Sequence, residues 1–152
     1  MSLFENEKRA KIVARIGRLT PDAPALWGRM NVNQMICHCT DGLRGCLGEL
    51  GDFRDESNFL TRSALKWLVL YVLPIPKEVP TAKRVDQVDG TGTRPTDFET
   101  DRRTLIEFVE KVADRPADFE WSPHFKFGAL SRAEWGALCH KHIDHHLRQF
   151  GV

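Results

Sequence analysis

Residues 131–151 read SRAEWGALCHKHIDHHLRQFG, and this stretch decides the expected fold. Ser131, followed by Glu134 three residues later, is the capping-box pattern that begins a helix. Gly151 is suited to end that helix, so we expect it to cover residues 132–150. Of the six histidines in the chain, four lie within seven residues of this segment: His140, His142, His145 and His146. A helix would give each of them a defined face.

The spacing of His142 and His146 is the chemically informative feature of this helix. Positions i and i+4 lie on one face about one turn apart. Two imidazoles held this way can share one metal ion, as in the zinc-protease helix. Both belong to stripes that also carry Trp135, so we expect His142 to point into the protein. The alternative is a solvated helix end, to which nearby Lys141 and Arg148 would be suited.

Two histidines do not complete a metal site, and the remaining candidates are His38 and His124. His38 lies in an expected helix that begins near Asn31 or Asn33 and runs towards Leu47. Taken alone, it is more typical of a satisfied core residue than of a ligand. Its neighbours Cys37 and Cys39 point about 100° away on a helix, so the three cannot chelate one ion. His124 is a candidate fourth ligand, an acid–base group beside the metal, or a surface residue.

The other segments predict an all-α protein with one domain over residues 1–152. Helices are expected at residues 5–19, 58–73 and 97–113, with the apolar segment 58–73 buried and Thr96 capping the segment that follows it. Residues 74–94 form a long loop that could cover a site as a lid. Glycines at 42, 45 and 48 indicate either a fraying helix or a close approach by another backbone or a ligand. The architecture expected is a four-helix bundle with an added helical segment.

Composition narrows the classes of partner. Among 152 residues, 22 Lys and Arg balance 21 Asp and Glu, for a formal net charge of +1. This balance indicates neither nucleic-acid binding nor a polybasic membrane contact. No apolar stretch has the length of a membrane span, and the charged N-terminus has no signal core. Four cysteines without a disulfide framework are typical of reduced thiols, so we expect a cytoplasmic protein.

Several motifs together resemble a known family. They are Trp27-Gly28-Arg29-Met30, Gln34-Met35-x-x-His38, Phe127-Gly128-x-Leu130-Ser131-x-x-Glu134-Trp135, and His142-x-x-His145-His146-x-x-Gln149. In this order they resemble the DUF1569 branch of the DinB/YfiT-like metalloenzyme superfamily. The resemblance implies an up-down-down-up four-helix bundle, often dimeric. It also implies a zinc or nickel site formed by His38, His142 and His146, with His145 in a supporting or packing role.

The functional expectation combines spacing with this resemblance. We expect a metal-dependent enzyme, thiol transferase-like or hydrolase-like, that activates a low-molecular-weight thiol or water and acts on a small molecule. His124 is the candidate catalytic side chain. One alternative is a metal- or ligand-binding protein without turnover. Another is a helical interaction module with its histidines at a homodimer interface.

Overall fold

The computed structural model describes residues 1–51, 56–77 and 79–152. The elements in this part of the chain are all helical, which confirms the all-α class. They are α1 (Asn6–Ile16), α2 (Val32–Cys46), α3 (Phe59–Arg62), α4 (Ala64–Trp67), the π-helical turn η1 (Leu68–Val72), the 3-10 turn η2 (Lys83–Val85), α5 (Phe98–Ala113) and α6 (Arg132–Gln149). Among the described helices, none combines the length and apolarity needed to cross a membrane.

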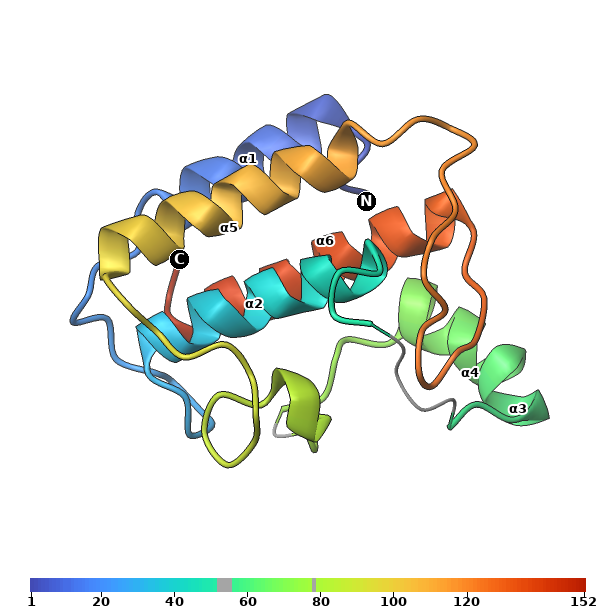
Figure 1. Ribbon diagram of the computed structural model, residues 1–152, viewed down its shortest axis with the longest axis horizontal. Helices are drawn as coiled ribbons and strands as arrows, with labels where there is room; N and C mark the ends of the chain where they lie inside the picture. Colours follow the sequence, from blue (N-terminus) through green and yellow to red (C-terminus); the bar gives the residue numbers. More distant parts are fainter. Residues whose placement is uncertain (52–55, 78) are drawn as a thin grey trace.

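The four long helices form the core. In Figure 1, α1 and α5 lie side by side above α2 and α6. Helix α2 packs against α5, α6 packs against α1, and α2 and α6 pack against one another. The seam is filled by fully buried aliphatic side chains from all four: Ile12, Ile16, Met35, Ile36, Leu43, Leu105, Val109, Ile143 and Leu147. Burying each of these side chains contributes roughly 1.5–3 kcal/mol to folding. This core holds α2 and α6, which carry the histidines, in contact.

The predicted caps hold at two of three helix starts. Asn31 and Ser131 each form a full capping box, with Gln34 and Glu134 respectively. At α5 the prediction was wrong by one residue, because Asp97 rather than Thr96 accepts from the backbone N–H of Thr100. The Thr96 hydroxyl instead donates to Asp101. A carboxylate at the start of a helix also interacts favourably with the helix dipole, which favours Asp97.

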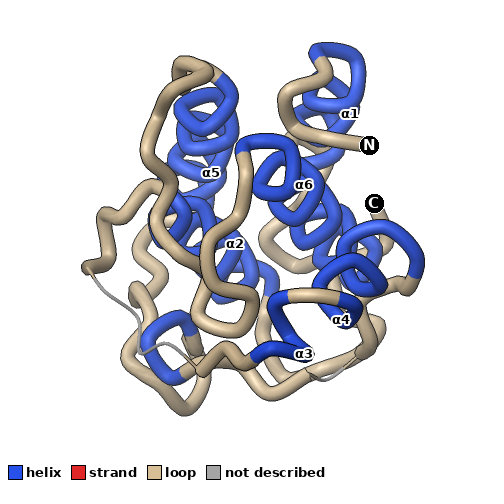
Figure 2. The backbone as a smooth tube through the Cα atoms, turned by 90° about the vertical axis from the view of Figure 1, so that its right-hand side faces the viewer, coloured by secondary structure: helices blue, strands red, loops and turns tan. Residues whose placement is uncertain are grey.

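The expectation of one buried helix over residues 58–73 was wrong. The helix is interrupted at Ser63, whose φ and ψ are −117° and −108°, and continues as α4 and then η1. Its large apolar side chains face outward, with Phe59 88% and Trp67 59% exposed, whereas Leu70 is buried. In Figure 2 this segment lies outside the layer formed by the long helices. The apolar pattern indicated a hydrophobic segment correctly, but it could not show that no helix in the described part of the chain covers these side chains.

The loop over residues 74–94 is tied to α2 through Asp41, whose side chain is only 1% exposed. Its carboxylate accepts hydrogen bonds from the backbone N–H and hydroxyl of Thr93, at 2.8 and 2.7 Å, and from Nε2 of Gln87 at 2.8 Å. A buried carboxylate is stable in a protein when it is satisfied in this way. The loop, whose residue 78 lies outside the described part, is therefore anchored one turn from His38.

Candidate metal centre

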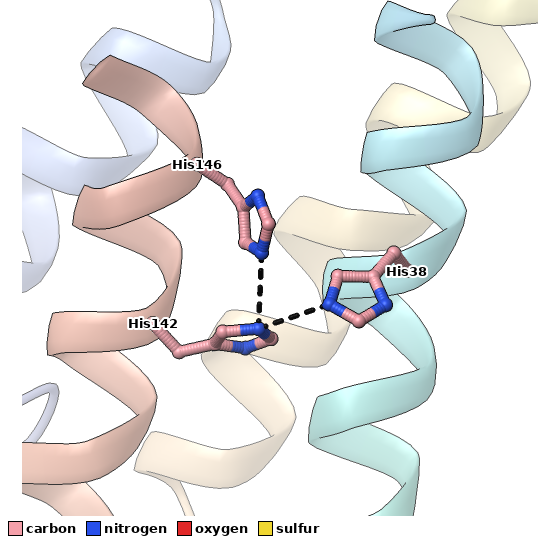
Figure 3. Close-up of side chains that lie close together, drawn as sticks. All are labelled: His38, His142 and His146. Atoms are coloured by element: carbon pink, nitrogen blue, oxygen red, sulfur yellow. Dashed lines mark hydrogen bonds between the residues drawn. The ribbon is translucent and has the colours of Figure 1, made fainter. Parts of the chain in front are cut away.

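Three histidines from two helices converge on one point. His38 comes from α2, and His142 and His146 come from successive turns of α6 (Figure 3). Nε2 of His142 lies 3.1 Å from Nε2 of His38 and 3.2 Å from Nε2 of His146. Within the described ranges, these three side chains form a group whose ligand atoms lie within 4.8 Å of one another. The structure thus brings together the three residues that the sequence predicted.

The outer nitrogens of two of these rings are held by acceptors. Nδ1 of His38 lies 2.7 Å from the carbonyl oxygen of Val85, which can only accept, so this nitrogen carries the proton. Nδ1 of His146 lies 2.8 Å from Oε1 of Gln149. The other end of that amide donates to the Trp27 carbonyl at 2.6 Å, which fixes the oxygen toward His146. Both rings therefore present an unprotonated Nε2 to the centre.

This arrangement fits a metal ion. A proton on Nε2 of His142 could be donated to His38 or to His146, but not fully to both, so one buried lone pair would lack a donor. A cation would accept all three lone pairs. Nitrogen ligands about 2.0–2.1 Å from a tetrahedral ion lie about 3.3 Å apart, close to the observed separations. The outer hydrogen bonds are of the kind that orients metal-binding histidines.

Burial keeps the three imidazoles neutral. It lowers the pKa of His142 well below its usual value, and repulsion from His146 and His38 lowers it further. Burial likewise lowers the pKa of His38, although the hydrogen bond to Val85 and the charge of Asp41 oppose this. The pKa of His146 falls to about 3 for the same first reason. Neutral imidazole is the form that binds metals, so the centre is ready to bind at neutral pH.

Gly42 makes room for His142. A Cβ atom at this position would lie 3.3 Å from both Cε1 and Nδ1 of the His142 ring. The close approach at Gly42, which lies inside α2, is therefore made by a side chain and not by the backbone or ligand that the glycine series was expected to admit. The helix does not fray at Gly42, because α2 continues to Cys46. It ends just before Gly48, whose φ is +78°.

A cavity of about 700 Å³ adjoins the three histidines. Its lining is mainly apolar and comes from four parts of the chain: residues 27–30, one face of α2 between His38 and Cys46, the loop residues 75–76 and 79–89, and α6 between Trp135 and Gln149 together with residues 123–125. Sites for small molecules are typically of this size and polarity. The loop expected as a lid does line the cavity, and its anchored end supplies the Val85 carbonyl to His38.

The remaining histidines do not belong to the three-histidine group. His124 lines the cavity but is not in the three-histidine group. His145 is half-buried beside it, with its ring centroid 5.6 Å from that of Trp27 and 5.1 Å from that of His146, in a packing role. His140 is buried and lies towards α1 rather than towards solvent. Cys37 and Cys39 are buried free thiols outside the group.

Sequence reasoning missed three groups that support the ligands. A backbone carbonyl such as that of Val85 leaves no trace in a sequence. Gln149 had a detectable signal, because it follows His146 by three residues on the same helix face. Asp41 also had a detectable signal, because it is a carboxylate three residues after His38 among neighbours that are buried. Charged residues at such positions are rare unless they are paired.

A family model matches the chain. The model of the family described as "Protein of unknown function (DUF1569)" matches residues 3–151, almost the whole chain. No curated protein and no solved structure matches the chain. The motifs that resemble this family therefore all lie within the residues that its model matches.

Proposed function

We propose that this chain, which belongs to the DUF1569 family, binds one divalent metal ion through His38, His142 and His146. We further propose that it is a metal-dependent enzyme. The observation that carries this proposal is the convergence of three Nε2 atoms whose rings are oriented from outside by Val85 and Gln149. Imidazole ligands suit zinc and nickel, which are the ions we propose.

The geometry favours an open site. Structural zinc sites are usually closed by four protein ligands, whereas catalytic sites have three and an open position. Here three ligands lie beside a cavity large enough for a small molecule. An ion held by three neutral imidazoles keeps its full charge and would favour the deprotonated form of a bound thiol or water. The mainly apolar wall would bind the rest of a small substrate or low-molecular-weight thiol.

The fold and setting belong to the same proposal. We infer that α1, α2, α5 and α6 form a DinB/YfiT-like four-helix bundle with up-down-down-up connections, since these four helices share the core. The four cysteines are buried and unbridged, which supports a reducing, cytoplasmic setting. The candidate catalytic side chain is His124, because it lines the cavity without joining the metal group.

Metal analysis of protein purified without a histidine tag tests the site. We expect about one zinc or nickel per chain, and loss of most of that metal in His142→Ala. His140→Gln is the matched control, since it removes a histidine of the same helix outside the group. Metal-free wild-type protein after incubation with Zn²⁺ or Ni²⁺, or full metal content in His142→Ala, would refute the proposal.

A second test separates catalysis from binding alone. A non-catalytic metal protein remains the alternative, because Gln149 and Val85 would orient ligands equally well for a structural ion. Metal-loaded protein is assayed against electrophiles with a panel of cellular thiols, and against hydrolysable esters and amides. Metal-dependent turnover that disappears in His142→Ala supports the enzyme. Absence of turnover with a large chelator-induced drop in melting temperature favours the alternative.

A further inference from the structure

Residues 124–128 form a small closed loop on the cavity wall. The backbones of His124 and Gly128 exchange two hydrogen bonds, each 2.8 Å long. Gly128 has φ +68°, a left-handed conformation that glycine adopts at little cost. The loop therefore presents the His124 side chain in one orientation.

The protonation of the His124 ring is decided by this loop. Nδ1 lies 3.2 Å from the backbone N–H of Lys126 and 3.2 Å from that of Phe127. A backbone N–H can only donate, so Nδ1 must be the unprotonated, accepting nitrogen. In a neutral ring the proton then resides on Nε2, at the opposite edge.

The His124 ring is packed among three aromatic side chains. Phe125 and Phe127 both stack on it with centroid separations of 4.7 Å and interplanar angles of 30° and 16°. Trp135 lies against it at 5.7 Å. In the described part of the chain, Nε2 of His124 makes no hydrogen bond. It is also not among the fully buried polar atoms that lack a partner. His124 lines the cavity, so Nε2–H is its free polar group there.

We propose that the Nε2–H of His124 is a fixed hydrogen-bond donor that binds a carbonyl or carboxylate oxygen of the ligand in this cavity. The ligand class is then a small, mainly apolar molecule with an oxygen acceptor. This inference rests on the proposed function for the identity of the cavity as the ligand site. It assigns His124 to substrate binding as a donor. A general base would need an unprotonated Nε2, and the proton of the neutral ring would then lie on Nδ1, where two backbone N–H groups already donate.

The electrostatics agree with a donor that stays neutral. Burial lowers the pKa of His124 to about 4, and the charge of Lys126 contributes to the shift. The ring is therefore uncharged at neutral pH.

Nitrogen NMR of histidine-labelled, metal-free protein tests the tautomer directly. We expect the His124 signals of an Nε2–H tautomer, unchanged between pH 7.5 and 5.5. An Nδ1–H tautomer, or protonation of His124 near pH 6.5, would overturn the inference. Because this measurement needs no metal, a failed metal proposal would leave its result intact.

Ligand binding tests the donor role. Hexanamide and hexylamine are titrated into zinc-loaded protein by calorimetry, since the first has an oxygen acceptor and the second has none. We expect hexanamide to bind and hexylamine not to bind. His124→Met should weaken hexanamide binding by about tenfold, the usual effect of one hydrogen bond. His124→Gln, which keeps an N–H donor at a similar reach, should stay within about threefold of the wild type.

Three outcomes would overturn the donor role of His124. One is absence of hexanamide binding to the wild-type protein. Another is equal binding to His124→Met. The third is loss of zinc from His124→Met, which would make His124 a metal ligand. Zinc loss confined to His142→Ala, together with weakened hexanamide binding in His124→Met, supports both proposals separately.

Discussion

Gln149 is almost fully buried, and both ends of its amide have partners. The oxygen accepts from Nδ1 of His146, and the nitrogen donates to the Trp27 carbonyl. Gln149→Leu keeps the volume and removes both hydrogen bonds, so Nδ1 of His146 loses the acceptor that fixes its tautomer. We expect metal affinity to fall by about 10- to 100-fold, measured by competition with a chromophoric chelator.

The control for this prediction is Gln149→Glu. A carboxylate still accepts from Nδ1 of His146 but cannot donate to Trp27, so we expect a smaller loss of metal affinity than in Gln149→Leu. If Gln149→Leu bound metal as tightly as the wild type, the hydrogen bond between His146 and Gln149 would not be needed for metal binding.

The residues of the centre were partly readable from the sequence. The i, i+4 spacing on one helix indicated His142 and His146 directly, because helix geometry alone places them together. His38 lies about a hundred residues away, and only the family resemblance selected it over a satisfied core histidine. Its alignment depends on the Val85 carbonyl and on the loop anchored by Asp41, which are tertiary contacts that no local pattern reports.

At the level of the helices, Gly42 sets how closely α2 approaches α6. Gly42→Ala removes an interior glycine, which should favour the helix by up to about 1 kcal/mol. The added Cβ would press on the His142 ring at 3.3 Å. We therefore expect little loss, or a gain, in the free energy of unfolding of the metal-free protein, but weaker metal binding. Urea denaturation and a metal titration measure the two effects.

Gly17→Ala is the matched control for this helix prediction. Gly17 has helical φ and ψ at the end of α1, and a Cβ there would make only ordinary contacts of 3.5 Å or more. It should leave metal affinity unchanged. If Gly42→Ala bound metal as tightly as Gly17→Ala, the close approach would have no role at the centre.

Helix starts and helix faces differed in how well the sequence predicted them. Asn31 and Ser131 satisfy backbone N–H groups within three residues, so their caps were local and the predictions were confirmed. Segment 58–73 has an apolar pattern, but its burial depends on a partner surface elsewhere. In the described part of the chain no such surface covers Phe59 and Trp67, which are exposed.

Across the whole molecule, this exposed apolar face is the strongest reason to expect self-association. Large exposed apolar side chains gathered on one segment are typical of interaction surfaces, and this segment exposes Phe59, Trp67 and Tyr71. We predict a homodimer in light scattering after gel filtration. Phe59→Glu combined with Trp67→Glu should give a monomer with full metal content. Arg103→Glu, an equal change of charge on exposed α5, should stay dimeric. A monomeric wild-type protein at tens of micromolar would contradict this prediction.

Acid stability is also a property of the whole molecule, because all six histidines have a pKa lowered by burial. An unfolded histidine takes up a proton near pH 6.5, whereas folded His124 and His146 resist protonation until about pH 4 and 3. Between these limits the unfolded state binds more protons, so the stability present above pH 6.5 is lost as the pH falls.

Urea denaturation of chelator-treated protein at pH 7.5 and 5.0 measures this loss. We expect a lower free energy of unfolding at pH 5.0, with each such histidine adding up to about 1.4 kcal/mol per pH unit below pH 6.5. His124→Gln should lose less stability over the same interval, because one of the buried titrating groups is gone. Bound metal should raise stability at pH 7.5 and be released on acidification, as protons compete for the imidazoles. Equal stability at the two pH values would mean that the histidines take up protons in the folded protein, and the neutral centre inferred from burial would be wrong.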